Sequence, residues 1–310
     1  MAVTRILAID GGGIRGIIPA ILLERLAADP HHSGWLDRVD LLAGTSTGGL
    51  ISLALAAGLS PAVIREVYET KGRAIFDDSW LDDLTDLGRL RGADYDLKNL
   101  RRELQRIFGK KTLADLRKRV LIPAFDLDNE HPDESLRSWK PKLFHNFPGK
   151  DSDGDRLVYK VALYTSAAPT YFPSEDGYVD GGLYATNPSM CALAQALDCR
   201  RRHPARLEDI VLLSLGTGTS LVHIHGRSLD WGYIQWVKPI LSIMLDGVAG
   251  IADYQCAQLL GPRYLRLAPH FPPGKRVRMD DVKQIPYMKE FANGIDLAET
   301  VSWLRSMWMV

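Results

Sequence analysis

The chain has 310 residues, of which 46% are hydrophobic, and its 38 Lys and Arg residues balance 38 Asp and Glu residues. This length can bury a substantial core, and a net charge of zero gives no overall attraction to nucleic acid or to an anionic membrane. Three cysteines without a CxxC pair disfavour a disulfide scaffold and favour a reducing compartment.

The N-terminus leads directly into a strand pattern over Arg5–Ile9, without a basic region followed by a long apolar run. We therefore expect no signal peptide and a cytoplasmic protein. The longest apolar runs lie near Leu50–Leu59 and Pro239–Leu245. Both are shorter than the roughly 18 to 20 residues that a membrane-spanning helix needs, so we expect no transmembrane segment.

The first part of the chain alternates strand and helix patterns. After the strand at Arg5–Ile9 we expect a helix, a strand and two further helices, at Ile17–Ala28, Val39–Ala43, Leu50–Ala57 and Pro61–Thr70. Later strands are expected at Val120–Phe125, Leu157–Ala162 and Ile210–Ser214, with a helix over Pro188–Leu197. The alternation predicts a three-layer α/β/α fold around a mostly parallel sheet.

No repeat or Pro/Ser-rich linker divides the chain, so we expect one domain over residues 1–310. The motifs described below lie in a core at about 5–193, and 194–310 is expected to complete the same domain. The polar segment Phe76–Asp96 interrupts the alternation and is interpreted as a surface loop with a short helix, or alternatively as a lid.

A serine lies where a strand pattern changes abruptly into a helix pattern, in Gly44-Thr45-Ser46-Thr47-Gly48. Glycines on both sides let the backbone turn sharply and keep the hydroxyl accessible. The start of the following helix directs N–H groups toward developing negative charge. This context indicates a nucleophilic serine at Ser46.

The first strand ends in a glycine-rich loop, Asp10-Gly11-Gly12-Gly13-Ile14-Arg15-Gly16, that has two interpretations. A dinucleotide-binding protein would hold a pyrophosphate there, with an acidic residue closing the next strand. Here the next strand ends in the serine turn instead, which disfavours nucleotide binding. In an acyl-transfer enzyme, the N–H groups of Gly11, Gly12 and Gly13 would form an oxyanion hole, because parallel strands bring both turns to one sheet edge.

The sequence offers several candidates for the base that Ser46 needs. None of the eight histidines stands out, although a downstream histidine in a Ser–Asp–His order stays open. Asp180 lies in Tyr178-Val179-Asp180-Gly181-Gly182-Leu183, where two glycines relieve crowding around a polar group. The same pattern is also typical of turns.

Taken together, these motifs resemble the patatin-like lipid acyl hydrolases. The resemblance extends over nearly the whole chain and depends on five ordered segments, at 10–20, 44–50, 165–173, 179–181 and 212–219. Patatin has Asp-Gly-Ala where this chain has Asp180-Gly181-Gly182, and Arg15 replaces a lysine. The resemblance implies a Ser–Asp dyad with Ser46 as nucleophile and Asp180 as base, and it implies neither a catalytic metal nor a cofactor.

The resemblance further implies an acyl-serine intermediate, with the Thr47 N–H joining the glycine loop in the oxyanion hole. Arg15 is expected to orient a substrate phosphate or to support the loop, with a structural salt bridge as the alternative. Burial is expected to raise the pKa of Asp180, because a free carboxylate is a weak base for a serine.

We therefore expect a phospholipase A or lysophospholipase type of enzyme with a lipid substrate and no nucleic-acid partner. The stretch Trp231–Leu260 is rich in apolar and aromatic residues, which fits core packing, a lid, or peripheral and reversible membrane contact. The alternatives are an acyltransferase or general carboxylesterase using the same site, and a non-catalytic storage or interaction protein of the same fold.

Overall fold

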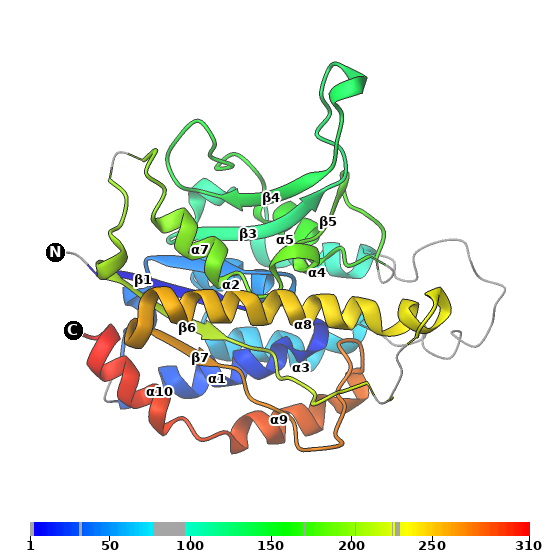
Figure 1. Cartoon of the computed structure of the whole chain (residues 1–310). Helices are drawn as coiled ribbons and strands as arrows, with labels where there is room; N and C mark the ends of the chain where they lie inside the picture. Colours follow the sequence, from blue (N-terminus) through cyan, green and yellow to red (C-terminus); the bar gives the residue numbers. More distant parts are fainter. Residues whose placement is uncertain are drawn as a thin grey trace.

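A computed structural model describes residues 3–30, 33–76, 97–169, 172–201, 203–224, 226 and 230–310 of the chain (Figure 1). The described residues form a central sheet in the order β4-β3-β2-β1-β6-β7, and β5 pairs with β3 off this path. The strands are β1 (Thr4–Ile9), β2 (Leu41–Gly44), β3 (Arg119–Asp126), β4 (Lys140–His145), β5 (Tyr178–Asp180), β6 (Ile210–Leu215) and β7 (Tyr264–Leu267).

The middle of the sheet is parallel. β1 pairs in parallel with both β2 and β6, and β2–β3 and β6–β7 are also parallel, whereas β4 and β5 run antiparallel to β3. The register places Ile9 beside Gly44, so the loops that follow β1 and β2 leave the sheet at the same edge. This register confirms the expected neighbourhood of the glycine loop and the serine turn.

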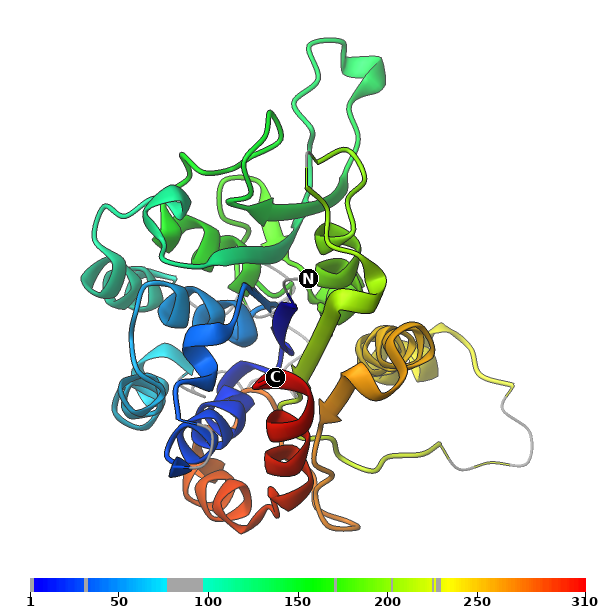
Figure 2. The same ribbon diagram turned by 90° about the vertical axis from the view of Figure 1, so that its left-hand side faces the viewer.

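Helices cover both faces of the sheet, which confirms the three-layer arrangement (Figure 2). Leu7 and Ile9 point into a core shared with α1, α2, α3, α5 and α9, while Ile6 and Ala8 point toward α7 and α8. The helices are α1 (Ile17–Ala27), α2 (Thr47–Ala56), α3 (Pro61–Phe76), α4 (Lys98–Phe108), α5 (Val158–Ser166), α6 (Gly182–Ala185), α7 (Ser189–Ala196), α8 (Tyr233–Leu260), α9 (Ile285–Gly294) and α10 (Ala298–Trp303).

The expected strand over Leu157–Ala162 is wrong, because this segment forms helix α5. Val158, Val161, Ala162 and Thr165 are all buried, and their spacing is that of one helix face. A short run of apolar and aromatic residues fits either a strand or a buried helix, and only the continuation to Thr165 reveals the helical period.

The sequence also did not predict the short or marginal strands β4, β5 and β7. β4 is an edge strand that begins Lys140-Pro141-Lys142, and proline is tolerated at an edge because no donor is needed there. β5 has only 3 residues. In β4 the apolar alternation is weak, and β5 is too short to display one.

α3 continues to Phe76, so the rest of the segment interpreted as a surface loop or lid, 77–96, lies outside the described residues. Within the described residues, no helix is both long enough and apolar enough to cross a membrane. The strands β6 and β7 lie beside β1 in the same sheet, so the part of the chain after 193 contributes directly to it.

Candidate active site

Ser46 occupies a strained turn between β2 and α2, with φ 54° and ψ −125°. Such a conformation costs a residue other than glycine on the order of 1–3 kcal/mol and persists only where the surroundings impose it. A Cβ atom on Gly44 would lie 2.0 Å from the Gly48 carbonyl oxygen, and one on Gly48 would lie 2.1 Å from the Ile9 carbonyl oxygen. Both glycines are needed because the turn packs directly against backbone.

Thr165 holds this turn in place from α5. Its buried hydroxyl accepts a hydrogen bond from the Ser46 N–H (2.9 Å) and donates one to the Pro123 carbonyl (2.6 Å) in β3. Thr165 belongs to one of the motif segments, but no role for it was predicted from the sequence. The available signal was a hydroxyl residue on the buried face of an apolar helix pattern.

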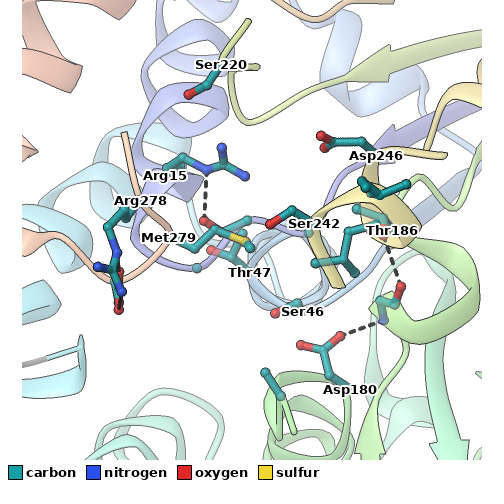
Figure 3. A pocket seen from close by; sticks show the side chains of 18 of the residues that line it. Arg15, Ser46, Thr47, Asp180, Thr186, Ser220, Ser242, Asp246, Arg278 and Met279 are labelled. Atoms are coloured by element: carbon teal, nitrogen blue, oxygen red, sulfur yellow. Dashed lines mark hydrogen bonds and ion pairs between the residues drawn. The ribbon is translucent and has the colours of Figure 1, made fainter. Parts of the chain in front are cut away.

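Asp180 ends β5 and faces Ser46 in the cavity (Figure 3). The carboxylate is 5% exposed, and its Oδ1 accepts a hydrogen bond from the Gly182 N–H (2.7 Å). Burial raises the pKa of Asp180 to about 6, while the hydrogen bonds from Gly182 and from the Ser46 hydroxyl oppose the rise. Among the described residues no cation pairs with Asp180, so its charge is balanced only by hydrogen bonds.

The glycine loop lies next to the serine turn, since a Cβ on Gly11 would lie 3.5 Å from the Ser46 Cβ. The Gly11 N–H donates to the Thr186 carbonyl (2.9 Å) and is therefore engaged. The candidate oxyanion donors are then Gly12, Gly13 and Thr47. Thr47 is the first residue of α2, where an N–H has no acceptor within the helix.

The shape of the loop depends on contacts from the C-terminal part of the chain. A Cβ on Gly12 would lie 2.2 Å from the Thr217 Oγ1, and the Thr217 hydroxyl donates to the Gly11 carbonyl (2.9 Å). Gly13 has φ 58°, in the left-handed region, and a Cβ there would lie 2.1 Å from the Met279 carbonyl oxygen. Side chains at Gly12 and Gly13 are thus excluded by neighbouring atoms, and at Gly13 by the backbone conformation as well.

A buried ion pair anchors the start of the loop. The Asp10 carboxylate receives two hydrogen bonds from the Arg266 guanidinium of β7, at 2.7 Å and 2.5 Å. The same guanidinium donates to the Ser214 hydroxyl of β6 (2.7 Å). No role for Arg266 was predicted from the sequence, because a partner 256 residues away leaves no local pattern.

Arg15 contacts the loop that it was expected to support, because its Nε donates to the Gly12 carbonyl (3.4 Å). Arg15 also lines the cavity, together with Arg276 and Arg278. A role for Arg15 in binding a substrate phosphate stays a prediction.

These groups surround a cavity of about 760 Å³ at the carboxyl edge of the sheet. Its wall is largely apolar and includes Leu50, Phe172, Leu183, Trp231, Ile243 and Leu245. His223 is the one histidine of the described chain that lines it. In the part of the chain that the structure describes, no three His, Cys, Asp or Glu side chains group to hold a metal ion. The arrangement suits an ester with an apolar chain, attacked by Ser46.

The chain is similar to a protein family model and to several known proteins. Residues 7–193 match the family model described as Patatin-like phospholipase. The cGAMP-activated phospholipase of Vibrio cholerae is 32% identical over 321 residues, covering 94% of this chain and 84% of the relative. Patatin-like protein 1 of Oryza sativa is 29% identical over 296 residues, covering 81% and 69%. The solved structure of VipD from Legionella pneumophila aligns with a TM-score of 0.49 and 11% identity, covering 99% of this chain and 67% of VipD.

The hydroxyl of Thr165 provides a first test of how the serine turn is held. We expect Thr165→Val to lower the free energy of unfolding by on the order of 2 kcal/mol, because it removes the hydrogen bonds of the Thr165 hydroxyl to the Ser46 N–H and to the Pro123 carbonyl. Denaturant unfolding measures this change. Thr165→Ser keeps the hydroxyl and is the control, so a serine variant at least as unstable as the valine variant would contradict the assignment.

The buried charge of Asp180 provides a second test. Its folded-state pKa of about 6 lies above that of an unfolded aspartate, so wild-type stability should fall as pH rises from about 4 to about 6 and stay lower above that. The Asp180→Asn variant has no ionisable group at this position, so its stability should not show this decrease with pH. Relative to wild type, the variant should therefore gain roughly 2 to 3 kcal/mol between pH 4 and pH 8, measured by denaturant unfolding. An equal stability difference at both pH values would contradict a raised pKa, whatever other effects the substitution has.

Proposed function

Because the chain belongs to the patatin-like phospholipase family, we propose that it is a lipid acyl hydrolase that cleaves carboxylic esters of phospholipids or other acyl lipids. The observation that carries the proposal is the placement of Ser46 and Asp180 face to face in the cavity (Figure 3). The match to the family model supports action on lipid esters, and this geometry supports Ser46 as the nucleophile.

In the proposed mechanism Asp180 takes the proton of the Ser46 hydroxyl while the oxygen attacks the ester carbonyl carbon. The N–H groups of Gly12, Gly13 and Thr47 stabilise the resulting oxyanion. A single well-placed donor of this kind typically contributes about 10²–10³-fold to kcat. The protonated Asp180 then gives its proton to the leaving alcohol, and an acyl-serine remains.

Water completes the cycle by the same route in reverse. Asp180 accepts a proton from the water as it attacks the acyl-serine carbonyl, and Ser46 leaves with that proton to release a free fatty acid. A pKa of about 6 keeps Asp180 ionised at neutral pH while making it a stronger base than an exposed aspartate. The buried environment of Asp180 thus allows this one carboxyl group to act as the base in both acylation and deacylation.

We also propose that the protein reaches its substrate by peripheral, reversible contact of α8 with membranes. Trp236, Ile240 and Met244 follow each other at four-residue spacing on α8 and are 37%, 45% and 50% exposed. Near the other end of the helix, by contrast, Cys256 and Leu260 are buried and pack in the core. Ile243 is exposed and also lines the cavity, so the apolar face continues into the site.

Reaction with a fluorophosphonate probe tests the nucleophile. We expect Ser46 to be labelled in wild type, with a rate that falls as pH drops below about 6, because a protonated Asp180 cannot accept the serine proton. Labelling should be lost in Ser46→Ala and slow at every pH in Asp180→Asn, read by intact mass. Equal labelling of Ser46→Ala, or no labelling of folded wild type, would refute the catalytic proposal.

Binding to vesicles tests the role of α8. Ile240→Glu combined with Met244→Glu should weaken sedimentation with phosphatidylcholine vesicles and lower the ratio of activity on vesicles to activity on a soluble short-chain ester. Leu136→Glu, at a 57% exposed position between β3 and β4, is the matched control. If the control lowers the ratio as much as the α8 variant, the contact is not specific to α8.

A further inference from the structure

A second, smaller cavity of about 50 Å³ lies between α2, α3 and α4. Leu50 and Leu100 line both this cavity and the large one beside Ser46. These two residues therefore lie where the two spaces adjoin. The remaining wall of the small cavity consists of Ile51, Ala54, Leu59, Ile64, Val67, Tyr68, Gly72, Glu103, Leu104, Ile107 and Phe108.

The small cavity offers almost no polar group to a ligand. The Tyr68 hydroxyl is hydrogen-bonded to the Thr47 hydroxyl, which leaves the ring to face the cavity. The Glu103 carboxylate pairs with Arg106 (3.0 Å) and Lys71 (3.7 Å). Such a lining suits hydrocarbon, because it offers water few hydrogen-bond partners.

The direction of α2 connects this cavity to the nucleophile. The helix starts directly after Ser46, and each residue advances about 1.5 Å along its axis, which places Leu50 about 6 Å and Ala54 about 12 Å from the serine. An acyl chain that leaves the Ser46 ester and follows α2 would pass Leu50 first. It would reach the small cavity only if it is long.

We propose that the small cavity binds the distal end of the substrate acyl chain, with Leu50 and Leu100 as its entrance and Ala54 as the residue that sets its size. This inference rests on the proposed function, whose substrate it narrows to long-chain acyl esters. The volume suits the last methylene groups of a chain rather than a whole chain. Each methylene moved from water into such a space is worth about 0.8 kcal/mol, or about fourfold in kcat/KM.

Filling the cavity from Ala54 tests the proposal. In the series Ala54→Val and Ala54→Leu, the ratio of kcat/KM for p-nitrophenyl palmitate to that for p-nitrophenyl butyrate should fall progressively, about tenfold or more for leucine. Val63→Leu, at an exposed position of α3 outside the cavity, is the control and should leave the ratio as in wild type. Circular dichroism and thermal unfolding verify that each variant is folded.

If Ala54→Leu does not fold, Ala54→Val and the opposite change Leu104→Ala decide the question. Enlarging the cavity at Leu104 should move the preferred chain length upward, whereas a general loss of packing would lower activity on all esters equally. A folded Ala54 variant with a wild-type ratio, or with equal losses on palmitate and butyrate, overturns the proposal while leaving the proposed function intact.

Binding to the Ser46→Ala variant provides a readout that does not depend on turnover. Calorimetric titration with palmitate should show binding that is weakened at least tenfold when Ala54→Leu is added, with octanoate affected less. Unchanged palmitate binding overturns the cavity assignment. Absence of all ester turnover and of fluorophosphonate labelling in wild type would instead refute the proposed function, and the palmitate titration would still decide what the cavity binds.

Discussion

The separation between Ser46 and Asp180 depends on one peptide in the middle of β3. The Pro123 carbonyl accepts the Thr165 hydroxyl that holds the Ser46 N–H. A Cβ on Gly181 would lie only 2.5 Å from the same carbonyl group, so the turn after Asp180 packs directly on it. Proline has a fixed φ and no N–H, which makes the backbone at Pro123 rigid. Its carbonyl accepts a hydrogen bond from a side chain. The positions of Ser46 and Asp180, the proposed dyad, thus both depend on the Pro123 carbonyl. A catalytic site must hold its reacting groups within about 0.5 Å of the productive geometry.

Two buried aspartates at this sheet edge differ in the groups that balance their charge. Asp10 is paired with both terminal nitrogens of Arg266, and its charge serves to hold the glycine loop. Asp180 is equally buried, and burial raises the pKa of both carboxyls; Arg266 opposes the rise at Asp10, whereas the Gly182 N–H and the Ser46 hydroxyl oppose it at Asp180. A cation beside Asp180 would stabilise the carboxylate and weaken it as a base. The carboxylate proposed as the base is therefore the one that has no cationic partner among the described residues.

The alternation of strands and helices, the serine turn and its position beside the glycine loop could be predicted because each depends on local patterns and on the general geometry of parallel sheets. Asp180 was a candidate from its two flanking glycines, but Asp-Gly-Gly is also a common turn, and only the family resemblance assigned it the role of base. The supports at Thr165 and Arg266 were missed because their partners lie 119 and 256 residues away. The hydrogen bond from the Gly11 N–H to the Thr186 carbonyl was missed for the same reason, because it joins distant segments of the chain.

The supports of the glycine loop lie in a different part of the chain from the loop itself. Every proposed catalytic side chain and oxyanion donor falls within the matched span 7–193, whereas Thr217, Arg266 and Met279 lie beyond it. Recombination between relatives near residue 193 would transfer the catalytic groups intact and yet combine the loop with foreign neighbours. A side chain in place of Gly12 or Gly13 would meet Thr217 or Met279, so glycine at these two positions is matched to residues from the other part of the chain.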